Sequence, residues 1–209
     1  MRIGRKFKWL LVLFVVAAAA GFSAVRAYWG DVTNEAATLM EALELKPGMT
    51  AADVGAGDGK MTVILAQRLG PSGRMYSTEL EPEELRAATA GFANVAVIQA
   101  GEQQTNLPAE CCDAIVMRMV YHHITNPAAM NASLFQALRP GGRLAVIDFS
   151  PRFWAFWLPR PGGVPEDRGG HGMPPAALVE ELGRAGFRLE RRIDDWPKLN
   201  YCVIVRKPV

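Results

Sequence analysis

An acidic residue followed by alternating glycines is the first feature of this sequence that could bind a ligand. Asp53 precedes Gly55, Ala56, Gly57 and Gly59. Glycine lets a backbone approach a ligand closely, because it has no Cβ atom. The spacing differs from the G-x-G-x-x-G loop that binds a dinucleotide pyrophosphate, and no Lys-Ser or Lys-Thr follows, as a P-loop requires. A tight structural turn is the alternative interpretation.

A second acidic residue extends this candidate site. Glu79 stands 20 residues after Gly59, at the end of the next apolar segment, and Leu80 follows it. In a sheet of alternating strands and helices, a carboxylate at this point can accept hydrogen bonds from both hydroxyl groups of a ribose. The glycines and Glu79 together therefore favour a ligand that contains a nucleoside.

Three residues that could assist proton transfer follow a later apolar segment, and they are the catalytic candidates: Tyr121, His122 and His123. Imidazole titrates near neutral pH and can take a proton from a hydroxyl or an acidic carbon. The alternative is that a histidine here bonds the following turn and only shapes the pocket. His123, closest to the turn before Pro127, is the better structural candidate. No metal site is predicted, because adjacent histidines do not chelate and no third ligand is suitably spaced.

The pattern of apolar segments predicts an α/β fold in which helices cover a parallel sheet. From Thr33 onward, helix-like and strand-like periods alternate, and Gly or Pro marks nearly every boundary. Only seven residues separate the last two strands, so these two must pair antiparallel. We expect helices at 34–45, 60–69, from Pro82, at 127–138 and 175–185, and strands at 50–54, 74–78, 95–99, 114–117, 143–149, 187–193 and 201–206.

These features resemble the class I S-adenosylmethionine-dependent methyltransferases, from about Thr33 to the C-terminus. Residues 53–59 match the family's first motif, D-x-G-x-G-x-G, at every position. Residues 112–117 match its fourth strand, and residues 138–148 match the helix-turn-strand segment that follows. The histidine pair is similar to that of many small-molecule members, including the quinone-type group. The resemblance implies a Rossmann-like, three-layer α/β/α fold with a seven-stranded, mostly parallel sheet and an antiparallel last strand.

The resemblance also implies S-adenosylmethionine as the cofactor. Its methionine part would lie along the glycine loop and its ribose on Glu79, and Glu102 would accept a hydrogen bond from the adenine amino group. The expected cofactor-binding residues are Asp53, Gly55, Ala56, Gly57, Gly59, Glu79, Leu80, Glu102, Gln103 and Arg118.

The implied activity is methyl transfer by in-line displacement to a small, apolar or lipid-like acceptor. The chief task of the protein is then to align the acceptor and the methyl group in a dry pocket. The alternative is a non-catalytic S-adenosylmethionine-binding sensor or assembly module at a membrane. Transfer of a different group, as in the aminopropyltransferases, is disfavoured because their acidic pair is missing after the fourth strand.

The N-terminal residues have the pattern of a signal peptide or a membrane anchor. Four basic residues precede an uncharged run of 17 residues from Trp9 to Val25, and small residues suit cleavage after Ala27. At about 1.5 Å per residue this run spans about 25 Å, the lower limit for a bilayer core of about 30 Å. We expect a hydrophobic helix within 1–27 and the methyltransferase domain at 28–209.

The location of the domain is left open by two opposing arguments. Basic residues favour a cytoplasmic N-terminus, which places the body on the far side of the membrane. S-adenosylmethionine, however, is made in the cytoplasm. The sequence therefore predicts an exported or membrane-associated protein without deciding the side.

Charge disfavours a nucleic-acid partner. The 209 residues suit one domain, and the net charge of +2 includes five basic residues and no acidic residue within 1–27. The remainder has 18 basic against 21 acidic residues, a net charge of −3. Its one small basic cluster, at Arg188, Arg191 and Arg192, is too small to follow a phosphate backbone. The Asn-Pro-Pro-Tyr type of segment that grips base amines is also missing after the fourth strand.

Cys111, Cys112 and Cys202 form no C-x-x-C motif and predict no disulfide framework. We interpret Cys111 and Cys112 as two small apolar residues that enter a strand, with a strained redox pair as the alternative.

The segment 150–173 is unusually long for a connection in a compact domain. Its aromatic run at 153–158 predicts a lid over the acceptor site, and His171 could move with it. The same aromatic residues, flanked by Arg152 and Arg160, suit contact with a membrane as the first alternative. The second alternative is that these aromatic residues form a small, separate apolar core beneath a loop. The sequence does not indicate an oligomeric state.

Overall fold

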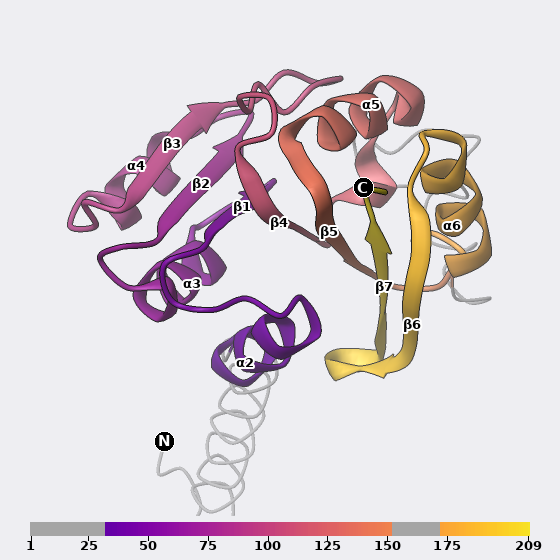
Figure 1. Ribbon diagram of the computed structural model, residues 1–209, viewed down its shortest axis with the longest axis horizontal. Coiled ribbons are helices and arrows are strands. Elements are labelled where there is room, and N and C mark those ends of the chain that lie inside the picture. The colour runs from indigo at the N-terminus through magenta and orange to yellow at the C-terminus, as the bar shows by residue number, and fades with distance from the viewer. Residues whose placement is uncertain (1–31, 152–171) are drawn as a thin grey trace, which may run out of the picture.

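Seven strands form one sheet in the computed structural model, which describes residues 32–151 and 172–209 (Figure 1). The strand order is β3-β2-β1-β4-β5-β7-β6. The first five strands run parallel, and β7 pairs antiparallel with both β5 and β6. This arrangement confirms the expected Rossmann-like fold. The strands are β1 (Thr50–Val54), β2 (Arg74–Glu79), β3 (Val95–Gln99), β4 (Cys112–Arg118), β5 (Leu138–Asp148), β6 (Arg188–Trp196) and β7 (Asn200–Arg206).

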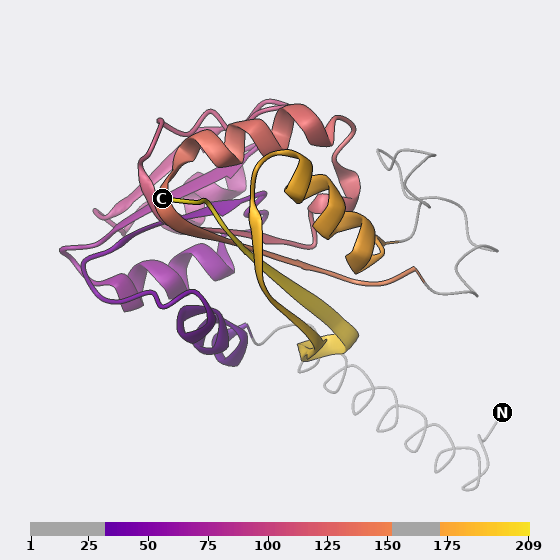
Figure 2. The ribbon, with the colours of Figure 1, turned by 45° about the vertical axis from the view of Figure 1, so that its right-hand side comes forward.

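Helices cover both faces of the sheet and give the molecule three layers. Figure 2 shows α5 (Pro127–Ala137) and α6 (Pro175–Arg184) above the sheet, and α2 (Thr33–Ala42) and α3 (Lys60–Leu69) below it. The short helix α4 (Glu83–Thr89) packs beside α3. A 3₁₀ turn, η1 (Tyr121–His123), follows β4, and another, η4 (Pro197–Leu199), joins β6 to β7.

Two apolar cores lie on the two faces, because successive side chains of a strand point to opposite sides. In β4, Ile115 and Met117 belong to the core under α5 and α6. Ala114 and Val116, from the same strand, belong to the core under α2 and α3. A strand whose residues are buried on both faces reads as a continuous apolar run, which is what the sequence shows here.

Several element boundaries differ from the sequence-based expectation. β5 begins at Leu138 instead of 143, because Leu138 pairs with Cys112 across an irregularity in the β4–β5 register. Helix α2 ends at Ala42 instead of 45, and Glu44 has a left-handed φ of 55°. Pro82 precedes α4 and is not its first residue.

Three predicted features lie outside the described residues. These are the N-terminal hydrophobic helix at 1–27, the aromatic run at 153–158 and His171. Within 32–151 and 172–209, none of the helices is both long enough and apolar enough to cross a bilayer.

Candidate functional site

A cavity of about 460 Å³ opens at the carboxyl ends of β1, β2, β3 and β4. β1 and β4 are neighbours in the sheet although two strands separate them in the sequence, so the strand order reverses between them. Ligands bind at such a switch point, and the volume suits a small molecule. The lining residues are Val54, Gly55, Glu79, Leu80, Ala100, Gly101, Glu102, Val120, His123, Ile124, Thr125 and Met130.

The glycine loop forms one wall and is fixed to the neighbouring strand. The backbone N–H groups of Gly55 and Ala56 both donate to the carbonyl oxygen of Thr78, at 2.9 and 3.1 Å. Gly55 has a φ of +73°, and a Cβ atom on it would lie 2.5 Å from Cγ2 of Val120. Gly57, with a φ of +52°, faces open space. The loop therefore needs glycine at Gly55 both for its conformation and for the close approach of Val120.

The Glu79 carboxylate is held in place by two backbone donors. The N–H of Gly57 donates to Oε2 and the N–H of Leu80 donates to Oε1, both at 2.8 Å. A carboxylate has about four lone-pair positions, so each oxygen retains capacity for a further donor. Glu79 thus joins the glycine loop to the end of β2 and can still accept two hydroxyl groups.

Asp53 lies beneath the glycine loop instead of on the cavity wall. It is 2% exposed, and the Thr62 hydroxyl donates to its Oδ2 at 2.7 Å. The same hydroxyl contacts Oγ of Ser77 at 2.7 Å. Burial raises the pKa of Asp53 to about 6, while the Thr62 bond and the charge of Arg118 act in the opposite direction. Asp53 therefore supports the glycine loop from beneath, through its hydrogen bond to Thr62 of α3.

The segment after β3 contributes a second wall, opposite the glycine loop. Glu102 lines the cavity, together with Leu80, whose side chain is 48% exposed. Gln103 is directed elsewhere, since its Oε1 accepts from Nδ2 of Asn126 at 3.1 Å. Asn126 in turn caps the N-terminus of α5 by accepting from the N–H of Ala129. Gln103 therefore anchors this segment to α5.

Two further predicted residues point into the protein. Arg118 donates through Nε to Oε2 of Glu35 at 2.9 Å, on the face covered by α2, and is not among the lining residues. Tyr121 is fully buried on the other face. Its hydroxyl donates to Oε2 of Glu181 at 2.9 Å and accepts from Nδ2 of Asn131 at 2.8 Å. Both side chains thus make hydrogen bonds that join secondary-structure elements to one another.

His122 is buried against Asp148, which ends the neighbouring strand β5. Nδ1 of His122 lies 2.9 and 3.0 Å from the two carboxylate oxygens, and the His122 backbone N–H donates to Oδ2 at 3.1 Å. The N–H of Phe149 also donates to this carboxylate. Because a carboxylate accepts, we assign the imidazole hydrogen to Nδ1, which leaves Nε2 as an acceptor. Asp148 is a site residue that the sequence motifs do not identify, although it ends strand β5 beside β4.

His123, the next residue, lines the cavity. Its ring centroid lies 4.1 Å from that of His122. Burial, with a smaller effect of His122, lowers the pKa of His123. The structure encloses His122 and places His123 at the cavity, whereas the sequence favours His123 for the structural role.

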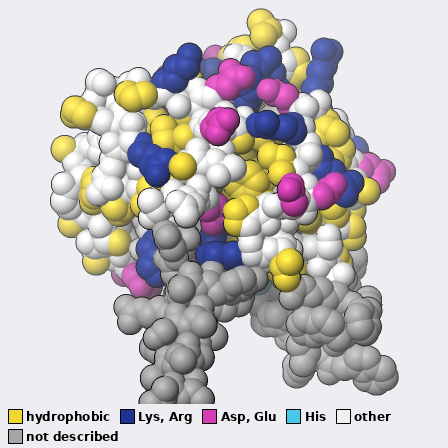
Figure 3. All heavy atoms as spheres, turned by 90° about the horizontal axis from the view of Figure 1, so that it is seen from below, with side chains coloured by type: hydrophobic (Ala, Val, Ile, Leu, Met, Phe, Trp, Pro, Cys, Tyr) yellow, Lys and Arg dark blue, Asp and Glu magenta, His cyan; other side chains and the backbone are white. Residues whose placement is uncertain are grey.

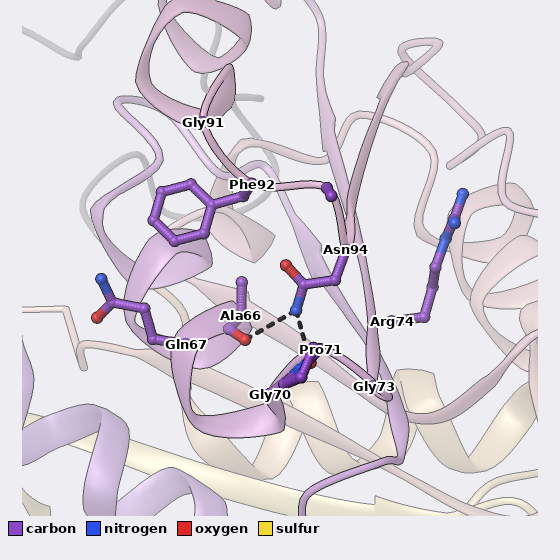
Figure 4. A pocket seen from close by; sticks show the side chains of 10 residues that line it. Ala66, Gln67, Gly70, Pro71, Gly73, Arg74, Gly91, Phe92 and Asn94 are labelled. Carbon is purple, nitrogen blue, oxygen red and sulfur yellow. Dashed lines mark hydrogen bonds between the residues drawn. The ribbon is translucent and has the colours of Figure 1, made fainter.

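Another hollow, of about 400 Å³, lies at the amino-terminal ends of β2 and β3, whereas the first cavity opens at their carboxyl ends (Figure 4). Its central polar group, the amide of Asn94, donates to the carbonyl oxygens of Ala66 and Gly70 at 2.9 and 3.0 Å. This amide is thus used to cap the end of α3. None of the residues that the sequence predicts for the site lines this hollow.

Comparison with known sequences places these features in a family. A family model described as a methyltransferase domain matches residues 24–191. The ubiquinone/menaquinone biosynthesis C-methyltransferase UbiE of Shewanella pealeana is 26% identical over 117 residues, which are 53% of this chain and 47% of that protein. The UbiE protein of Pasteurella multocida is 26% identical over 112 residues, 51% of this chain and 42% of that protein. The match thus spans about half the length of these curated relatives.

Solved structures share the fold over most of the chain. A SAM-dependent methyltransferase from Aquifex aeolicus is 25% identical, with a TM-score of 0.66. The aligned region covers 82% of this chain and 88% of the Aquifex chain. The [4+2]-cyclase SpnF is 16% identical, with a TM-score of 0.67, and the aligned region covers 87% of each chain. The motif residues, the strand order and the family match agree, and the chain belongs to the methyltransferase domain family, as a class I S-adenosylmethionine-dependent member.

Proposed function

We propose that this protein transfers the methyl group of S-adenosylmethionine to a small, apolar or lipid-like acceptor. The observation that carries the proposal is the cavity at the switch point, with the preset Glu79 carboxylate on one wall and the His123 imidazole on another. A site of this kind can hold a nucleoside-containing cofactor and present its reactive end to a second molecule.

The residues present fit S-adenosylmethionine. Glu79 has free lone pairs for the two ribose hydroxyls, and Glu102 can accept from the adenine amino group. The methionine part would lie along the backbone of Gly55 and Gly57; Gly57 faces open space, whereas Val120 packs against Gly55. When bound, the cofactor supplies the electrophilic methyl group, and the protein supplies orientation.

An apolar acceptor agrees with the rest of the lining. Val120, Ile124 and Met130 contribute hydrocarbon surface next to His123. The sulfonium charge disappears during methyl transfer, so a dry and apolar environment does not oppose the reaction. The relatives named as C-methyltransferases of ubiquinone and menaquinone biosynthesis support a ring carbon of a quinone-type molecule as the methylated atom.

Transfer to carbon requires that the acceptor lose a proton. His123 is placed to receive it, because its lowered pKa leaves the ring uncharged at neutral pH. His122 contacts the His123 ring from inside the protein and is itself held by Asp148. In this proposal His123 is the catalytic residue, and Asp148 and His122 are positioning residues.

The surface does not favour nucleic acid as the acceptor. On the face shown in Figure 3, basic and acidic side chains are interspersed with apolar ones. Among the described residues, the exposed Arg184 and Arg192 each pair with a carboxylate, on Glu180 and Asp194 respectively. Phosphate backbones are bound by grouped and unpaired cations.

Binding is tested by calorimetry with S-adenosylmethionine and S-adenosylhomocysteine. We expect Glu79→Gln to weaken both ligands about 10- to 100-fold, because hydrogen bonds to a charged group contribute about 1.5–3 kcal/mol. Glu84→Gln, an exposed carboxylate in the first turn of α4, is the matched control and should leave both affinities unchanged. Absence of heat with both ligands, or equal affinity in Glu79→Gln, would refute the cofactor site.

Transfer is tested with a labelled methyl group and a demethylated, short-chain prenylated hydroquinone as the acceptor. Labelled product that extracts into organic solvent supports the proposal. Cofactor binding without transfer to this acceptor or to a total lipid extract would instead favour the non-catalytic sensor.

A further inference from the structure

Cys111 and Cys112 are a pair of thiols that the proposed methyl transfer does not use. Both are free, and their sulfur atoms lie 3.0 Å apart. They stand at the start of β4, whereas the cavity lies beyond the other end of that strand. With six steps of about 3.3 Å along β4, the two sites are about 20 Å apart.

The contact between the sulfur atoms depends on a break in the regular strand. Adjacent residues of a strand point to opposite faces, which would separate the two thiols. Here Cys111 precedes the strand, and Glu110 before it has a left-handed φ of 50°. The β4–β5 register is also irregular between Cys112 and Ala114. The backbone thus brings together two side chains that a regular strand would hold apart.

The two thiols differ in accessibility and in surroundings. Cys112 is fully buried, whereas Cys111 is partly exposed. The hydrogen bond from Cys112 and the charge of Arg139 lower the pKa of Cys111. Cys202 provides the contrast, since burial raises its pKa to about 12. Of the two thiols, Cys111 is therefore the one that an outside reagent can reach, and its surroundings favour ionisation.

We propose that Cys111 and Cys112 form a dithiol site that closes reversibly into a vicinal disulfide by exchange with a low-molecular-weight disulfide. The Cys111 thiolate attacks one sulfur of the outside disulfide and releases one thiolate, which leaves a mixed disulfide on Cys111. Cys112 then loses its proton to solvent and attacks the Cys111 sulfur, which releases the second thiol. The two protein thiols are oxidised, and the outside disulfide is reduced to two thiols.

The test uses the full chain, first reduced and then incubated with oxidised glutathione, followed by intact-mass measurement and peptide mapping. We expect a loss of about 2 Da, the two thiol hydrogens, located in the peptide that holds Cys111 and Cys112, and its reversal by dithiothreitol. The same mass loss should occur in Cys202→Ser.

The single variants show which step each thiol performs. Cys112→Ser should stop at a stable glutathione adduct, and Cys111→Ser should react at least about tenfold more slowly, because the remaining thiol is buried. A stable glutathione adduct on the unmodified chain, a disulfide-linked dimer, or no reaction would each overturn the proposal. Because none of these measurements depends on methyl transfer, their outcome is independent of the activity.

Discussion

The imidazole of His123 lines the cavity. Burial and His122 lower its pKa below the ordinary value of 6.5, so the ring is uncharged and able to accept a proton at pH 7. If His123 alone controls the rate, turnover should be constant above pH 6.5. It should fall as the pH decreases through the lowered pKa of His123. Asp53, with a pKa of about 6, also titrates below neutral pH but does not line the cavity.

We expect His123→Gln to lower the transfer rate by at least about 100-fold and to flatten the acidic limb of the rate profile, because glutamine cannot accept the proton. Affinity for S-adenosylhomocysteine, measured across the same pH range, should stay close to that of the unmodified protein and thereby separates the effect from titration of Asp53. An acidic limb that persists unchanged in His123→Gln would rule out this residue as the base.

At the same scale, sequence motifs locate the backbone better than they locate side chains. Glu79 and Gly55 line the cavity because each follows or ends a strand whose path the sequence pattern fixes. Asp53 belongs to the same motif as Gly55, and Arg118 directly follows the fourth-strand match, yet both side chains face the side of α2 and α3. The face of the sheet that a side chain reaches depends on strand pairing and on contacts such as that of Arg118 with Glu35, which no local spacing contains.

At the scale of the elements, a buried carboxylate of helix α2 bonds two strands of the sheet. Glu35 is 2% exposed, and its two oxygens accept from Nε of Arg118 on β4 and from Nε1 of Trp196 on β6, both at 2.9 Å. A buried carboxylate is stable when charged donors satisfy it, and its loss leaves the donors without a partner. This contact joins three elements that are far apart in the sequence.

We expect Glu35→Ala to lower the free energy of unfolding by about 2–4 kcal/mol, because it leaves the partly buried Arg118 guanidinium and the buried Trp196 N–H without their acceptor. Glu41→Ala is exposed on the same helix and should change it by less than about 0.5 kcal/mol. Urea denaturation followed by circular dichroism measures both. Similar midpoints for the two variants would contradict a stabilising role for the Glu35 contact.

Elements with strong local signals agree with the prediction to the residue. Thr50–Val54, Lys60–Leu69 and Val95–Gln99 have the expected bounds, because their apolar periods are regular and a Gly lies within four residues of each end. The start of β5 was placed too late, since the Pro-Gly-Gly segment reads as a turn in isolation. Pairing of Leu138 with Cys112 overrides that local preference.

At the scale of the whole molecule, we propose that residues 1–27 bring the domain to a membrane or export it. The charge pattern of these residues supports this proposal, and an apolar acceptor would be found there. Cell fractionation should find the full chain in the membrane or exported fraction, and a chain that lacks residues 1–27 in the cytosol.

Val15→Arg places a charge in the centre of the apolar run, at a cost of about 2.5–3.5 kcal/mol for insertion, and should have the same effect as the deletion. A full chain that stays in the cytosolic fraction would refute the proposal. A reporter fused after Val209 then shows on which side of the membrane the domain lies.

The position of β7 has a consequence for how the protein is made. β7 is the last strand to leave the ribosome, yet it lies between β5 and β6 inside the sheet. Strands β1 to β5 can assemble during translation, but β6 has no partner until residues 200–206 have emerged. The sheet is therefore completed only after synthesis of its final strand, and until then the nascent chain exposes an unpaired β5 edge.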